Sequence, residues 1–227
     1  MRYLSKWEVI MKKARVAAAV VLAGLMLFGC KASGSSPFPP EQSAIYVNRD
    51  KEIYTAIVEN YDAGKDYYDG AELKVLAEEE AAAYNAENPV VSGGVGENGT
   101  GAVKLTECTM ENGIARVIYQ YADGKSLSQF TERVQDEKNH AEALSVSTVA
   151  DGLLAGKVTD GTWYDVKKSA ATTLDEVMKQ SKMNLVSVEG TVTVQTEGAI
   201  LYYSGNVTLK DEYTADVADG KAYLIFK

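Results

Sequence analysis

The stretch from residue 103 to residue 121 reads VKLTECTMENGIARVIYQY, and it decides the fold class of this chain. Two runs that suit β-strands, 103–110 and 114–121, flank the dipeptide Asn112-Gly113. Asn and Gly accept the positive backbone angles that a tight primed turn requires. Alternate residues of the second run share one face: Ala115, Val117, Tyr119 and Tyr121. The stretch therefore predicts an antiparallel hairpin with one buried face.

The segment before this hairpin predicts two more strands and a helix. Residues 44–48 and 53–60 are strand-like and are separated by a polar turn. Asp69 with Glu72 resembles a capping box, which predicts a helix over residues 70–86 that stops before Pro89. The apolar stripe of this helix contains Leu73, Leu76, Ala77, Ala81 and Tyr84. The stripe predicts an amphipathic helix packed on the sheet.

The segment after the hairpin predicts three shorter helices. A second capping-box pattern begins at Ser126 and introduces a short helix. Residues 140–155 have an ambiguous pattern, for which we favour a helix that stops at Gly156. Thr173 opens a third helix that runs to about residue 181.

Short strand-like runs fill the last forty-odd residues, with glycine-containing turns between them. These runs are 185–188, 191–195, 199–203, 207–210, 214–217 and 222–226. The last run is apolar on both faces, which favours a central strand. We therefore predict an α+β fold, an antiparallel sheet with packed helices and a β-rich C-terminal part. The expected boundary separates an α+β domain at 44–168 from a short helix and β-rich part at 169–227, packed on it.

The N-terminal segment has the three parts of a bacterial secretion signal. Lys12, Lys13 and Arg15 are positive, an apolar run follows, and Leu27-Phe28-Gly29-Cys30 ends it. This ending resembles the lipobox of bacterial lipoproteins, and the whole layout is similar to uncharacterised lipoproteins of Gram-positive bacteria. The resemblance implies signal cleavage between Gly29 and Cys30 and a lipid on the Cys30 thiol. It implies a cell-membrane location facing out of the cytoplasm.

Several further expectations concern this anchor. Residues 1–29 would be the signal peptide, and Met11 starts a better-formed signal than Met1, so we hypothesise that translation starts there. Residues 30–43 would form the lipidated cysteine and a flexible tether, because Ser, Gly and Pro dominate them. Two acyl chains give stable anchoring without a basic patch.

The amino-acid composition limits the classes of partner that this protein can bind. The chain has a net charge of −9, and the predicted signal removes five basic residues and one acidic residue, which leaves a more acidic protein. This charge argues against nucleic-acid binding. With Cys30 lipidated, Cys108 is the other cysteine of the chain, so no internal disulfide is expected and Cys108 is read as a small core residue.

The remaining chemical patterns predict no catalytic residue, metal site or cofactor. Residues 94–99 match G-x-G-x-x-G, but a strand follows instead of a helix, which favours an ordinary loop. The spacing of Asp62, Asp66 and Asp69 matches no calcium-binding loop. Asp69 suits the N-cap of a helix instead. His140 is the single histidine and has no partner motif.

Tyrosine is the most suggestive feature for binding, with fourteen Tyr against four Phe. Most suit half-buried strands. Trp163-Tyr164, expected in a loop, and Tyr67-Tyr68 are the candidate ligand contacts, because neither pair suits a strand face.

Three functions stay open. The first is a non-catalytic lipoprotein that binds a partner protein or envelope component, the second a carbohydrate- or solute-binding accessory module, and the third an extracytoplasmic hydrolase.

Overall fold

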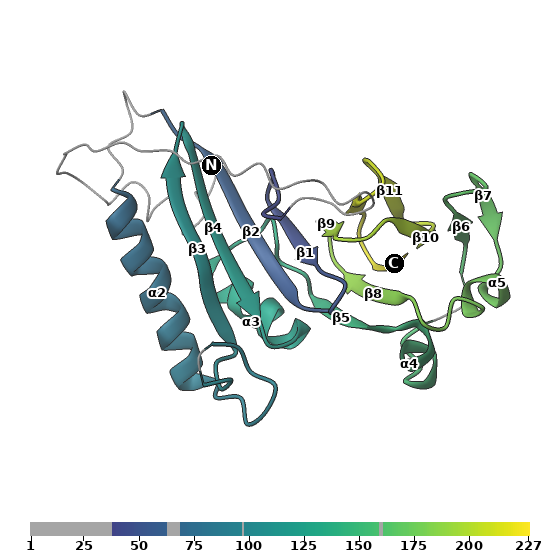
Figure 1. Cartoon of the computed structure of the whole chain (residues 1–227), viewed down its shortest axis with the longest axis horizontal. Coiled ribbons are helices and arrows are strands. Elements are labelled where there is room, and N and C mark those ends of the chain that lie inside the picture. Colours follow the sequence, from purple (N-terminus) through teal and green to yellow (C-terminus); the bar gives the residue numbers. More distant parts are fainter. Residues whose placement is uncertain (1–37, 63–68, 97, 159–160) are drawn as a thin grey trace.

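Two sheets built mainly from antiparallel strands organise the chain, as Figure 1 shows. The computed structural model describes residues 38–62, 69–96, 98–158 and 161–227. These residues form four helices and thirteen strands. The predicted α+β class with a β-rich C-terminal part is confirmed.

The first sheet has seven strands in the order β11-β12-β9-β1-β2-β4-β3. They are β1 (Ala44–Val47), β2 (Ile53–Asn60), β3 (Val103–Glu111), β4 (Ile114–Tyr121), β9 (Val192–Thr196), β11 (Val207–Leu209) and β12 (Thr214–Val217). Only the β1–β9 pair is parallel. The N-terminal and C-terminal parts of the chain therefore meet within this sheet.

The predicted hairpin is the β3–β4 pair, and its turn has the expected geometry. Asn112 has φ 52° and Gly113 has φ 78°. The register pairs Glu111 with Ile114 next to the turn. Tyr119 and Tyr121 are buried, which confirms the predicted inner face of the second strand.

The second sheet has six strands in the order β5-β8-β13-β10-β6-β7. They are β5 (Ala143–Thr148), β6 (Trp163–Asp165), β7 (Ala170–Thr172), β8 (Asn184–Glu189), β10 (Ile200–Ser204) and β13 (Lys221–Phe226). The predicted central position of the last strand is confirmed, because β13 lies between β8 and β10.

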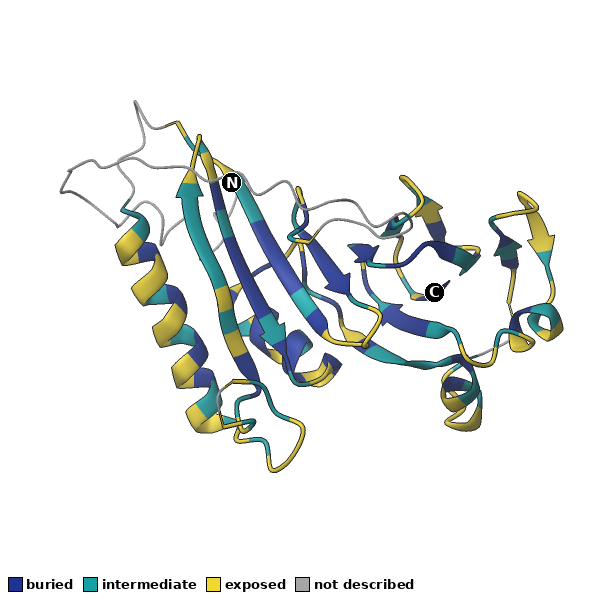
Figure 2. Ribbon diagram, viewed as in Figure 1, coloured by how far each residue is buried: buried dark blue, intermediate teal, exposed yellow. Residues whose placement is uncertain are grey.

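The helices are α2 (Gly70–Glu87), α3 (Gly124–Val134), α4 (Val149–Leu154) and α5 (Leu174–Met178). Asp69 caps α2 through its carboxylate, which accepts hydrogen bonds from the backbone of Ala71 and Glu72. The helix packs along β3, with its buried stripe against the sheet (Figures 1 and 2).

Two cores stabilise the fold. The main core joins the inner faces of both sheets to α2 and α3, and Phe130 of α3 contacts the rings of Tyr84, Tyr119 and Tyr121. The small core contains Val149, Trp163, Val177, Leu185, Tyr223 and Ile225. It lies on the opposite face of the second sheet, between this sheet and helices α4 and α5.

Three local predictions differ from the structure. Residues 143–148 form strand β5 instead of a helix, because they pair along the whole of β8; α4 begins only at Val149. Helix α3 begins at Gly124, because Asp123 provides the cap and Ser126 donates to it. Trp163 and Tyr164 lie in strand β6, which pairs with β10, and not in a loop.

The expected domain boundary between residues 168 and 169 falls inside the second sheet. Strand β6 precedes it, β7 follows it, and the two pair with each other. The segments 44–168 and 169–227 each contribute strands to both sheets. They are therefore interleaved within one two-sheet structure.

Candidate functional site

The turn between β1 and β2 forms one wall of the candidate site. Its conformation is fixed by a reciprocal pair of hydrogen bonds: the Asn48 amide donates to the Glu52 carboxylate (2.6 Å), and the Glu52 backbone N–H donates to the Asn48 side-chain oxygen (2.8 Å). Lys51 adopts φ 67°, so the backbone reverses within four residues. The turn presents four consecutive charged side chains, from Arg49 to Glu52.

The Glu52 carboxylate is held by donors from two further strands. The Tyr54 hydroxyl of β2 donates at 2.8 Å, and the Gln120 amide of β4 donates at 3.3 Å. Burial, with the hydrogen bond to Glu52, raises the pKa of Tyr54, so this phenol stays a donor at neutral pH. Three side chains therefore hold one carboxylate in place.

A glycine-rich loop after α2 forms the opposite wall through its residues 93–96. Val95 and Gly101 exchange two backbone hydrogen bonds, of 2.7 and 3.0 Å. A Cβ on Gly94 would lie 2.6 Å from the Gly99 carbonyl oxygen, and Gly93 and Gly96 have positive φ. The close approach of the two loop arms explains Gly94, and positive φ angles explain Gly96 and Gly99, so the glycines that match G-x-G-x-x-G agree with the interpretation of this segment as a loop.

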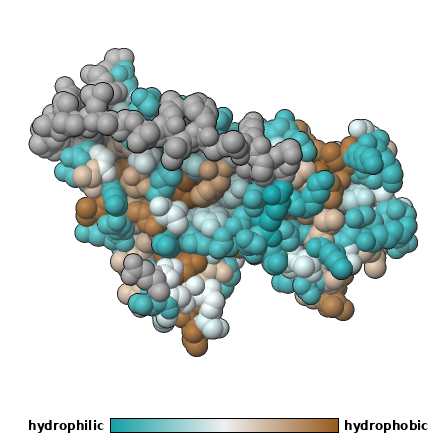
Figure 3. All heavy atoms as spheres, in the orientation of Figure 1, coloured by the Kyte–Doolittle hydropathy of each residue, from teal (hydrophilic) through white to brown (hydrophobic). Residues whose placement is uncertain are grey.

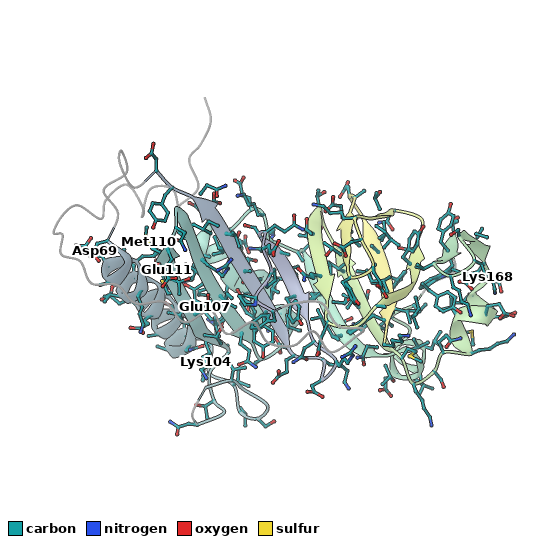
Figure 4. All side chains as sticks on the ribbon, turned by 45° about the horizontal axis from the view of Figure 1, so that its top comes forward. Asp69, Lys104, Glu107, Met110, Glu111 and Lys168 are labelled. Atoms are coloured by element: carbon teal, nitrogen blue, oxygen red, sulfur yellow. The ribbon has the colours of Figure 1, made fainter. Side chains whose placement is uncertain are left out.

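A polar cavity of about 390 Å³ lies between the two walls. Lys104 of β3 and Gln120 of β4 line it together with the turn and the loop. Figure 4 shows Lys104 at the start of β3, next to the loop, whereas Glu111 lies near the other end of the strand. We call this space the Glu52 cavity.

The strand register explains why these residues meet. Lys104, Gln120, Tyr54 and Tyr46 are direct neighbours on β3, β4, β2 and β1. Their side chains share the outer face of the first sheet, opposite the face that carries Tyr119. Phe38 packs on this row, with ring centroids 4.8 Å from Tyr46 and 5.0 Å from Tyr54. The end of the expected tether therefore lies against the sheet beside the cavity.

The structure separates the two aromatic residues that the sequence placed together. Trp163 is 1% exposed and stacks on Tyr223 in the small core, so its ring is not available to a ligand. Tyr164 points to the other face, where it stacks on Tyr203 at 5.3 Å. The expectation that Trp163 contacts a ligand from a loop is corrected by this burial. Tyr164 stays half-buried.

The other predicted site residues lie outside the part of the chain that the structure describes. Gly29, Cys30, Tyr67 and Tyr68 belong to the undescribed segments. Within the described part of the chain, no group of three or more His, Cys, Asp and Glu side chains is placed to hold a metal ion.

Two single residues have ordinary packing roles. Cys108 is a half-buried residue of β3, and burial raises the pKa of its thiol to about 11, which disfavours a reactive thiolate at neutral pH. His140 lies 3.1 Å from the Thr131 hydroxyl after α3. Neither residue adjoins the Glu52 cavity.

Sequence reasoning missed the Glu52 cavity, because its residues come from three separate segments. One local signal exists: Asn48 and Glu52, four residues apart around a charged turn, suit a side-chain clamp. The pairing of this turn with Gln120 and Lys104 depends on the order β2-β4-β3, which a single sequence does not reveal.

Comparisons with known protein families, curated proteins and solved structures return no match. Among the described helices, none is both long enough and apolar enough to cross a membrane. The visible surface in Figure 3 is mostly hydrophilic, and its hydrophobic areas are small and separate.

Proposed function

We propose that this protein is a lipoprotein, anchored outside the cytoplasm through Cys30, whose folded part binds a partner protein or a component of the cell envelope without catalysing a reaction. The observation that carries this proposal is the sequence Leu27-Phe28-Gly29-Cys30 after a positive and apolar segment. Phe38 already packs on Tyr46 and Tyr54 of the first sheet, so only residues 31–37 lie in the sequence between the lipidated cysteine and the described folded part.

The charge of the chain supports a binding role at a distance from the membrane surface. The net charge is −9, and an acidic protein is repelled by anionic head groups and by nucleic acid. The diacyl anchor then supplies the membrane affinity, and the folded part stays free to meet its ligand.

Metabolic labelling with a palmitate analogue tests the anchor. In bacterial cells, the wild-type chain should incorporate the label and sediment with membranes, because diacylglycerol is transferred to the Cys30 thiol. Cys30→Ala should stay unlabelled and keep its signal peptide, whereas Cys108→Ala, the matched control, should behave as wild type. A label that persists in Cys30→Ala would refute the lipoprotein assignment.

Crosslinking in intact cells, followed by mass spectrometry of the tagged protein, tests the binding role. Recovery of one abundant envelope protein supports a protein partner. Recovery of the chain alone supports the second candidate, a solute-binding accessory module, which the Glu52 cavity specifically favours. The hydrolase hypothesis has less support, because Glu52, one of the two carboxylates in the cavity, is already held by three donors.

A further inference from the structure

We propose that the Glu52 cavity binds a small zwitterionic ligand, a free amino acid or a short peptide. This inference rests on the proposed function, because the lipid anchor would place the cavity outside the cytoplasm, where the ligand would be met. The binding of the ligand itself does not require the lipid. Three features of the cavity carry it: size, balance of charge and the absence of an open aromatic face among its lining residues.

The size of the cavity fits one small molecule. Its volume of about 390 Å³ lies near the lower end of ligand pockets, which span about 300–1,000 Å³. Its walls are mainly charged side chains, an amide and glycine backbone, with Val95, Tyr121 and Ala122 as the other lining residues. The desolvation of the polar groups must be offset by polar groups on the ligand. An apolar ligand would leave these groups unpaired.

The charges of the cavity are of both signs. Lys51 and Lys104 form no ion pair or hydrogen bond through their side chains with any described residue, and neither does Asp50. Glu52 differs, because its three donors fix its orientation, although a carboxylate has about four acceptor positions and so keeps one for a ligand.

A ligand with one carboxylate and one ammonium satisfies this arrangement. The ligand carboxylate would meet the ammonium groups of Lys51 and Lys104, and its ammonium would meet Asp50 and the remaining acceptor position of Glu52. A ligand with a single charge would leave one of the two sets without a charged group of the ligand as its partner. Charge-assisted hydrogen bonds are the strong ones, so this matching sets the affinity.

The aromatic residue that lines the cavity does not suit sugar stacking. Tyr121 is 3% exposed, its hydroxyl is 2.8 Å from that of Thr55, and its ring packs against Phe130. Its ring face is therefore occupied within the core. A neutral saccharide would find neither a stacking platform nor a use for the four charges.

Calorimetric titration of the full-length chain in detergent micelles tests the inference. The probes are alanine and a panel of small dipeptides as zwitterions, acetate and methylamine as single charges, and N-acetylglucosamine as a neutral sugar. We expect binding of at least one zwitterion at millimolar concentration or better, and no comparable binding of the other three probes.

Charge-neutralising variants then locate the site. Lys104→Gln and Asp50→Asn change exposed side chains, and each should weaken zwitterion binding about tenfold, because each removes one charged contact. Lys182→Gln, an exposed lysine elsewhere, should leave the affinity unchanged. Thermal unfolding curves that match wild type confirm that the variants are folded.

Three results would overturn the inference: no zwitterion binds the wild-type chain, the neutral sugar binds as well as the zwitterions, or Lys104→Gln and Asp50→Asn bind like wild type. Each of these results can occur with palmitate labelling intact, so a failure here is distinguishable from a failure of the lipoprotein assignment.

Discussion

Asp136 is a buried acidic residue, and its burial disfavours the ionised form of the carboxyl group. It lies just after α3, is 5% exposed, and accepts a hydrogen bond of 2.7 Å from the Asn139 amide. Burial is the largest influence and raises its pKa from 3.8 to about 6, although the hydrogen bond from Asn139 lowers it. The Asn139 side-chain oxygen is buried without a hydrogen-bond partner, so this turn holds a second unfavourable group.

The raised pKa predicts that the chain loses stability as the pH rises from about 4 to about 6. The folded state binds the Asp136 proton more tightly than the unfolded state, so its stabilising effect is complete below pH 3.8 and is lost as the pH passes 6. A shift of this size corresponds to about 3 kcal/mol in the free energy of unfolding.

Asp136→Asn should remove this pH dependence and raise the free energy of unfolding at pH 7 by about 1–3 kcal/mol, because an amide carries no charge to desolvate. Its N–H can also donate to the unpaired Asn139 oxygen. Urea unfolding at acidic and neutral pH measures both effects. Glu137→Gln, a change of the same charge at the exposed neighbour, should keep the wild-type slope; equal slopes in all three chains would contradict the prediction.

Burial of single residues was the least predictable property at this scale. Trp163 and Tyr164 are adjacent in the sequence, yet one fills the small core and the other lies half-buried on the opposite face. A strand of three residues has too short a pattern to show alternation, so nothing local marks Trp163 as a core residue. Its burial depends on pairing with β10, about forty residues later.

Elements with strong local signals were predicted well, and elements defined by distant partners were not. The β3–β4 hairpin has its turn dipeptide and α2 has its cap Asp69, so both could be predicted from adjacent residues. Strand β5 has the sequence ALSVST, which periodicity alone did not distinguish from a helix. It becomes a strand because β8 supplies a complete antiparallel ladder.

The turn of the β3–β4 hairpin should tolerate glycine at its first central position and resist a side chain at its second. Gly113 has φ 78°, and an added Cβ would lie 3.2 Å from the Tyr61 carbonyl oxygen. Gly113→Ala should therefore cost about 1–3 kcal/mol. Asn112→Gly keeps the allowed positive φ and should cost less than about 1 kcal/mol. Urea midpoints of the two variants compare them directly, and an equal loss in both would show that the turn geometry is unimportant.

At the scale of the whole molecule, β13 joins the two cores. Its side chains alternate: Ala222, Leu224 and Phe226 face the main core, and Tyr223 and Ile225 face the small core. Arg49 adds a link between the sheets, because its backbone N–H donates to Glu197 and its guanidinium donates to the Lys227 carbonyl. The doubly apolar pattern of β13 was visible in the sequence, but the interleaving of the two sheets was not, because it depends on which distant strands pair.

This shared strand predicts that both cores unfold together. Leu224→Ala and Ile225→Ala should each cost about 2–5 kcal/mol, and each should lower one common transition, although the two side chains face different cores. In a Trp7→Phe background Trp163 is the remaining tryptophan, so its fluorescence reports on the small core, and far-ultraviolet circular dichroism reports on all strands. Coincident curves from the two probes are the mark of a single cooperative unit. If Leu224→Ala moved the dichroism transition and left the Trp163 transition in place, the cores would be independent, and β13 would not couple them.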